Sequence, residues 1–180
     1  TGEFERAFEL FDQVLTAIPN DPATLTSRGH ALKTTGDTGK AIASYQAAFT
    51  AKPDHGDAYY ALANLKTYQF DETQIAAMRT QVARTDLAFM DRVHFSFALG
   101  KAYEDAGDYE QSFQFYDEGN TLKRRQTRYD ADAMQSELQR QAEFCTSGLF
   151  AKHQGAGCPA PDPIFILGLP RAGSTLLEQI

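Results

Sequence analysis

The sequence is poor in the residues that build metal and redox sites. It holds two cysteines, Cys145 and Cys158, and four histidines in 180 residues. Neither residue type follows the spacing of metal ligands, and there is no Cys-x-x-Cys motif. We therefore expect no bound metal. Two thiols in a chain of this size favour a reducing compartment, so we expect a cytoplasmic location.

Long apolar runs and an excess of basic residues are also absent. No stretch approaches the roughly 18 apolar residues of a membrane span, and no signal peptide is recognisable. The formal net charge of −7 provides no overall basic field for a phosphate backbone. These absences argue against a membrane span and against a nucleic-acid partner, while a local anion site stays possible. Apolar residues make up 42% of the chain, so we expect it to fold.

A repeated pattern organises the first two thirds of the chain. Gly2 and Gly36 lie 34 residues apart, and each precedes a helical pattern. The same separation relates Pro19 to Pro53, Ala7 to Ala41, and Phe11 to Tyr45. A glycine can take the left-handed conformation that ends a helix, and a small residue lets the next helix approach closely. The pattern therefore predicts helix–turn–helix units.

These units resemble tetratricopeptide repeats. In residues 22–53, family positions are occupied by Gly29, Leu32, Gly36, Ala41, Tyr45, Ala48 and Pro53. A second copy carries Gly100, Tyr103, Gly107 and Tyr116. Between the two copies, the pattern of the first helix of a repeat is matched by Tyr59, Leu62, Ala63 and Tyr68. The resemblance implies an all-α solenoid over residues 1–126. Its first repeat is incomplete, so we expect a piece of a longer protein.

Helical patterns can be placed along the whole of this region and beyond it. We predict helices at 3–17, 22–35, 38–51, 56–68, 72–84, 90–105 and 109–126. Two connecting helices follow within residues 127–154, the first capped by Asp130 and ending near Phe144, the second capped by Thr146 and ending near Lys152. Glycine and proline make residues 155–163 a linker. By their spacing, Phe4, Phe8, Phe11, Phe113 and Tyr116 are expected in the core.

The resemblance also implies a partner-binding groove. Tetratricopeptide arrays bind peptides on a concave surface lined by the first helix of each unit, which here would include His30, Lys33, Asn64, Phe97 and Lys101. Lys33, Asn64 and Lys101 together would hold a carboxylate, which resembles the clamp that some of these domains place on a partner's C-terminus. The alternative is that these are ordinary exposed side chains of helix faces.

Residues 164–180 carry a different motif. An apolar run of strand length, Ile-Phe-Ile-Leu, leads through a glycine- and proline-containing turn into a helix-like pattern. A strand, a glycine-bearing loop and a helix N-terminus together form a cradle for a phosphate. In the loop of ATP- and GTP-binding proteins a lysine follows the second glycine, but here Ser174 follows Gly173. The positive charge lies within the loop instead, at Arg171.

Residues 170–175, Pro-Arg-Ala-Gly-Ser-Thr, resemble the 5′-phosphosulfate-binding loop of sulfotransferases. The resemblance implies that residues 164–180 are the first strand–loop–helix of a truncated α/β, P-loop-like sulfotransferase domain. Its donor would be 3′-phosphoadenosine 5′-phosphosulfate (PAPS), and its acceptor a hydroxyl or an amine. Arg171 would hold the 5′-phosphate. Gly173 would let the backbone approach it closely, and Ser174 and Thr175 would donate hydrogen bonds to it. Ala172 replaces the usual serine, so one hydroxyl contact is missing.

The leading hypothesis is therefore a sulfotransferase whose repeats serve as a protein-interaction scaffold. The catalytic base would lie beyond Ile180, so we expect the present chain to be inactive by itself. The alternative is a non-enzymatic tetratricopeptide module that binds peptides. A nucleotide kinase with a degenerate loop is a third possibility, which the missing lysine disfavours.

Overall fold

The computed structural model describes residues 3–65, 67–127, 129–157, 164–168 and 172–178. The chain divides into two compact units, Thr1–Tyr129 and Asp130–Ile180. The first unit contains helices α1 (Phe4–Ala17), α2 (Pro22–Thr34), α3 (Thr38–Ala51), α4 (Gly56–Ala63), α5 (Glu72–Val82), α6 (Phe89–Asp105) and α7 (Tyr109–Gln126). The second contains α8 (Ala131–Phe144), α9 (Ser147–Lys152) and α10 (Ser174–Glu178).

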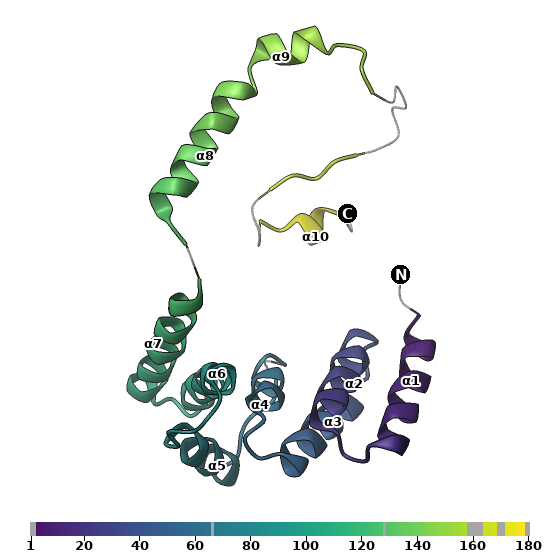
Figure 1. Cartoon of the computed structure of the whole chain (residues 1–180), viewed down its shortest axis with the longest axis vertical. Helices are drawn as coiled ribbons and strands as arrows, with labels where there is room; N and C mark the ends of the chain where they lie inside the picture. Colours follow the sequence, from purple (N-terminus) through teal and green to yellow (C-terminus); the bar gives the residue numbers. More distant parts are fainter. Residues whose placement is uncertain (1–2, 66, 128, 158–163, 169–171, 179–180) are drawn as a thin grey trace. The chain divides into compact units, whose positions relative to one another are not determined.

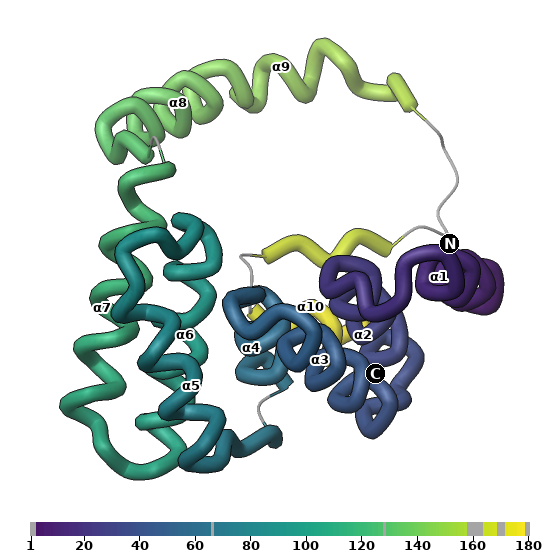
Figure 2. The backbone as a smooth tube through the Cα atoms, turned by 60° about the horizontal axis from the view of Figure 1, so that its bottom comes forward, coloured from purple at the N-terminus to yellow at the C-terminus, as the bar shows by residue number. Residues whose placement is uncertain are grey.

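The helices of the first unit pack side by side, and α4, α5 and α7 all contact α6 (Figure 1). The most extensive contacts join α2 to α3, α4 to α6, and α6 to α7, while α4 also packs against α3. The backbone trace in Figure 2 shows the same arrangement of α1 to α7 from a second direction. The predicted helix–turn–helix solenoid is therefore present in residues 3–127, as far as they are described.

The turns between paired helices are built in the same way in two repeats. Gly36 and Gly107 have φ angles of 88° and 78°, a region that glycine enters without a steric penalty. The next residue in each case is an aspartate, whose carboxylate accepts a hydrogen bond from a backbone N–H of the following helix, at 3.1 Å in both repeats. The glycine thus ends one helix and the aspartate begins the next.

Close contacts between a glycine and a tyrosine hold the paired helices together. A Cβ atom added to Gly29 of α2 would lie 2.4 Å from the ring of Tyr45 in α3. One added to Gly100 of α6 would lie 2.7 Å from the ring of Tyr116 in α7. The absence of a side chain on the first helix is therefore what makes room for the aromatic ring of the second.

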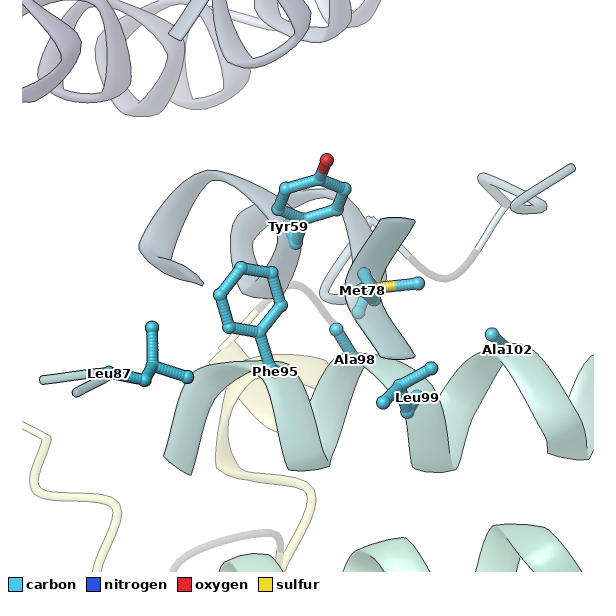
Figure 3. Packing of buried hydrophobic residues seen from close by; sticks show 8 residues of the cluster. Tyr59, Met78, Leu87, Phe95, Ala98, Leu99 and Ala102 are labelled. Atoms are coloured by element: carbon cyan, nitrogen blue, oxygen red, sulfur yellow. The ribbon is translucent and has the colours of Figure 1, made fainter. Parts of the chain in front are cut away.

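The largest core cluster joins α4, α5 and α6 (Figure 3). Phe95 of α6 and Tyr59 of α4 face each other with ring centroids 5.2 Å apart, and Met78 of α5 packs beside them. Tyr59 also stacks on Phe49 of α3 at 4.4 Å. Stacked and tilted aromatic pairs add stability beyond the area they bury, so this cluster joins the central helices of the unit.

Helix α4 is shorter than the sequence predicts. We expected it to extend to residue 68, but it ends at Ala63. Tyr68 lies in the following loop, where its hydroxyl is within 2.8 Å of the side-chain amide of Gln74, and Phe70 packs against Tyr59. These tertiary contacts require the chain to leave the helix, so the assignment of Tyr68 to a first helix was wrong.

The predicted position of Phe113 is also wrong. Its side chain is 70% exposed, whereas Phe4, Phe8, Phe11 and Tyr116 are partly buried. Ser112 and Gly119 are the buried residues of α7. A residue adjacent to Ser112 is rotated by about 100° around the helix axis, which takes Phe113 away from α6.

The helices of the second unit contain no buried residue. Asp130 and Thr146 cap α8 and α9 through their side chains, as the sequence predicts. The strand expected at residues 164–167 is not formed: residues 164–168 have no regular secondary structure, and no strand occurs elsewhere in the described chain. A strand requires a neighbour for its hydrogen bonds, and the described segments offer none.

None of the described helices is long and apolar enough to cross a lipid bilayer.

A glycine-to-alanine pair tests the packing between α2 and α3. We expect Gly29→Ala to lower the free energy of unfolding by about 1 to 3 kcal/mol, because its Cβ would overlap the ring of Tyr45. The control is Gly39→Ala in α3, where an added Cβ meets no atom within 4 Å. This control should be neutral or stabilising by about 0.5 to 1 kcal/mol. Urea unfolding measures both, and equal effects would contradict the packing argument.

Candidate functional site

Four partly exposed rings form a row across α4, α6 and α7. His94 stacks on Tyr60, with centroids 5.1 Å apart and an interplanar angle of 8°. Tyr60 lies 6.0 Å from Phe97, and Phe97 lies 6.3 Å from Tyr116. All four rings are partly buried and partly accessible. We call these four residues the aromatic row.

The aromatic row forms the floor of two adjoining hollows. One has a volume of about 250 Å³ and is lined by Tyr60, Ala63, Asn64, Phe97, Lys101 and Tyr116. The other has a volume of about 320 Å³ and is lined by Tyr60, Met90, Val93, His94, Phe97 and Lys123. Tyr60 and Phe97 line both hollows, so the two adjoin on one surface, which we call the groove.

Helical spacing places these side chains on common faces. In α6 the lining residues Met90, His94, Phe97 and Lys101 follow one another at intervals of three or four, and residues at such intervals are neighbours on one side of a helix. Gly119 lets α7 approach, because a Cβ there would lie 3.2 Å from the ring of Phe97. The groove therefore follows from the packing of α6 against both of its neighbours.

The three residues expected to hold a carboxylate are only partly brought together. Lys33 Nζ donates to the backbone oxygen of Asn64 at 3.4 Å, and Asn64 and Lys101 line the same hollow. Each has a partner within the chain: the amide of Asn64 donates to the carbonyl of Tyr60 at 3.0 Å, and Lys101 forms an ion pair with Asp105. An incoming carboxylate would have to compete with these contacts.

Two further residues were expected to line the groove. Phe97 lies at the centre of the aromatic row, whereas His30 lies apart from it. Nδ1 of His30 is 3.0 Å from the hydroxyl of Tyr45, between α2 and α3. Tyr60 and Tyr116 were not expected to line a binding surface. The helical register of Tyr60 with Asn64, four residues further along, would have identified it. No such signal was available for Tyr116, since no residue of α7 was expected to line the groove.

Two titratable groups of the row have shifted pKa values. Burial and a hydrogen bond that its hydroxyl donates to Glu104 at 2.9 Å raise the pKa of Tyr116 above its ordinary value. Burial lowers the pKa of His94 below 6.5, while the carboxylates of Asp57 and Asp91 oppose this shift. Nδ1 of His94 is buried without a hydrogen-bond partner in the described chain, 4.0 Å from Asp57 Oδ1. His94 is therefore neutral near pH 7.

The second candidate site is the loop before α10. Gly173 has a φ of 84°, and its carbonyl accepts hydrogen bonds from the backbone of Leu176 and Leu177 at 3.0 and 3.1 Å. Ala172, Ser174 and Thr175 are exposed beside it. Arg171, the cation expected to hold the 5′-phosphate, lies outside the described residues. The loop residues that are described therefore sit together at the start of a helix, and their role in PAPS binding stays a prediction.

The pKa of His94 predicts how stability depends on pH. Below about pH 6.5 the unfolded chain binds a proton at this position more readily than the folded chain, so stability is lost as the pH falls. We expect His94→Gln to reduce this loss. His153→Gln, at an exposed position after α9, should leave it unchanged. Unfolding in urea at several pH values measures the slopes, and identical slopes for the wild type and His94→Gln would contradict the burial argument.

Comparison with known proteins identifies the repeats. Residues 23–55 and 93–126 match the family model of the tetratricopeptide repeat. Over 116 residues, which make up 64% of this chain, the sequence is 31% identical to a protein of Aquifex aeolicus (strain VF5) described as uncharacterized. The chain spans 15% of the length of that relative. Helices α2–α3 and α6–α7, which carry the paired glycine and tyrosine contacts, coincide with the matched residues. The chain thus contains tetratricopeptide repeats.

Proposed function

We propose that this chain is a protein-interaction module, and that its groove on α4, α6 and α7 binds a peptide segment of a protein partner. The observation that carries the proposal is the aromatic row, which is accessible on the face of a repeat array. Tetratricopeptide repeats are interaction scaffolds, and their stacked helices provide extended binding surfaces.

Aromatic side chains suit such a surface for a physical reason. They offer large contact areas and lose little conformational entropy on binding, so they often contribute most of the affinity at interfaces. In this groove Phe97 is fixed against Gly119 and Tyr116 against Gly100. The rings are therefore held in place before a partner arrives, which reduces the cost of binding.

A pair of arginine substitutions tests this function. Asn64→Arg places a long side chain in the groove at an exposed position, and Ala43→Arg adds the same charge at an exposed position of α3, outside the groove. Each protein is used to select binders from a library of short random peptides displayed on phage. We expect wild type and Ala43→Arg to enrich the same peptides, and Asn64→Arg to bind them about tenfold more weakly or worse.

Two outcomes would reject the groove as the binding surface. In one, no peptide is enriched on the wild-type chain. In the other, the same peptides are enriched equally on all three proteins, which would place the binding surface elsewhere. Circular dichroism and thermal unfolding of each variant show whether a loss of binding reflects the groove or a loss of folding.

We also propose that the complete protein is a PAPS-dependent sulfotransferase, in which residues 164–180 supply part of the donor site. The proposal rests on the resemblance of residues 170–175 to the phosphosulfate-binding loop. Two features are compatible with it: Gly173 adopts a φ of 84°, and α10 begins at the next residue. At such a position backbone N–H groups are available to an anion. Arg171 would stabilise negative charge that develops on the leaving phosphate.

Substitution of Arg171 tests this second proposal in the complete protein. With labelled PAPS and a panel of hydroxyl and amine acceptors, Arg171→Ala should reduce transfer about a hundredfold or more, since a charge-stabilising donor is lost. Arg140→Ala, which removes an exposed arginine of α8, is the control and should retain full transfer. Equal transfer by wild type and Arg171→Ala would reject the role of Arg171. A wild-type protein that does not bind PAPS would reject the sulfotransferase.

A further inference from the structure

The two ends of the groove differ in chemistry, and the difference constrains the partner. At the end formed by Met90, Val93 and His94, the lining is mainly carbon. Met side chains adapt to the shape of an apolar ligand, and an imidazole stacked on a tyrosine offers a flat surface. The volume of about 320 Å³ has room for one large apolar or aromatic side chain.

A single lysine gives this hollow its charge. Lys123 lies at its edge and is exposed, and its Nζ makes one side-chain contact, to Gln126 Oε1 at 3.5 Å. No carboxylate of the described residues lies within ion-pair distance of it. Arg124 and Arg125 follow in the last turn of α7, so Lys123 belongs to a basic cluster although the chain as a whole is acidic. Lys123 is therefore available to a carboxylate of a partner.

Two carboxylates, those of Asp57 and Asp91, lie near His94 at this hollow. Asp91 Oδ1 accepts a hydrogen bond from the backbone N–H of Gly56 at 2.9 Å. Asp57 lies beside the buried Nδ1 of His94. Asp91 is thereby held toward α4, whereas Asp57 keeps its negative charge beside the neutral His94. Neither carboxylate lines the hollow, so Lys123 is the charged group of its lining.

At the opposite end of the groove, lined by Asn64, Lys101 and Tyr116, the charged side chains already have partners. Lys101 is paired with Asp105, and Glu104 accepts the hydrogen bond of Tyr116. The lysine of this end is therefore already paired with a carboxylate, whereas Lys123 is not. A partner carboxylate is favoured near Lys123 and disfavoured near Glu104 and Asp105, so the groove can fix the direction in which a peptide lies.

From this asymmetry we infer that the partner segment carries an aromatic or large aliphatic side chain next to an acidic residue. The apolar side chain occupies the hollow of Met90, Val93 and His94, and the acidic side chain pairs with Lys123. This inference rests on the proposed peptide-binding function and specifies the chemistry of the peptide. The recognised carboxylate is an internal acidic side chain, in contrast to the chain-terminal carboxylate that Lys33, Asn64 and Lys101 would hold.

A charge reversal tests the inference directly. The full chain and its Lys123→Glu variant are used to select from a phage library of short random peptides joined to the coat protein through their C-termini, so that no free carboxylate is displayed. The control is Lys152→Glu, which reverses the charge of an exposed lysine on α9. Selected peptides are then synthesised with amidated C-termini, and their affinities are measured by fluorescence anisotropy.

We expect wild type and Lys152→Glu to enrich peptides in which Asp or Glu lies within a few residues of an aromatic or large aliphatic side chain. Lys123→Glu should bind these peptides about tenfold more weakly. It should instead enrich peptides with Lys or Arg beside the apolar residue. Such an exchange of preferred charge is a result that simple loss of folding cannot produce.

The outcomes separate this inference from the function on which it rests. If peptides are enriched in a groove-dependent way, but their charge is the same on wild type and Lys123→Glu, the inferred chemistry is wrong while peptide binding stands. If the enriched peptides lack a large apolar residue, the hollow is not the anchor site and the inference is also wrong. If the wild-type chain enriches no peptide, the proposed function itself fails.

Discussion

The contact between a bare glycine and a tyrosine ring is the constraint on which the array depends. It occurs between Gly29 and Tyr45 in one repeat and between Gly100 and Tyr116 in another, with the same separation along the sequence. Any side chain on the glycine would push the paired helices apart. Because interiors are packed as densely as crystals, a shift at this contact would be transmitted to the neighbouring helices.

The groove is a consequence of this packing. Tyr116 both fills the space above Gly100 and ends the aromatic row, so one ring serves the core of a repeat and the binding surface. A second close approach joins the repeats: a Cβ on Gly56 would lie 2.6 Å from the backbone oxygen of Asp91. That contact brings α4 against α6 and places Tyr60 beside His94 and Phe97.

The parts of the fold that depend on local sequence could be predicted from it. Aspartate caps, glycines at helix ends and the separation of 34 residues are local or periodic features, and they located most helices within a residue or two. The end of α4 could not be found in this way, because it is determined by contacts of the following loop with helices α3 and α4: the Tyr68 hydroxyl accepts a hydrogen bond from Gln46 of α3, and Phe70 packs against Tyr59 of α4. A strand at residues 164–167 depends on partners that the described chain does not supply.

The candidate site, too, could be predicted from the sequence only in part. Phe97, Asn64 and Lys101 were expected on the binding surface because the repeat register identifies the first helices. The pairing of Tyr60 with His94 could not be predicted, since it depends on how α4 packs against α6, which is not the next helix in the sequence. Lys123 was not expected on a binding surface. Its position beside an apolar hollow requires the packing of α7 on α6.

The central claim is that the aromatic row is where a partner binds, and hydrogen–deuterium exchange tests it most directly. The full chain is compared in the absence and presence of a saturating amount of an amidated peptide selected on it. The account predicts slower exchange in α4 and α6 and in the part of α7 around Tyr116 to Lys123, with no change in α8 or α9. Protection confined to α8 and α9, or to α1 and α2, would contradict it.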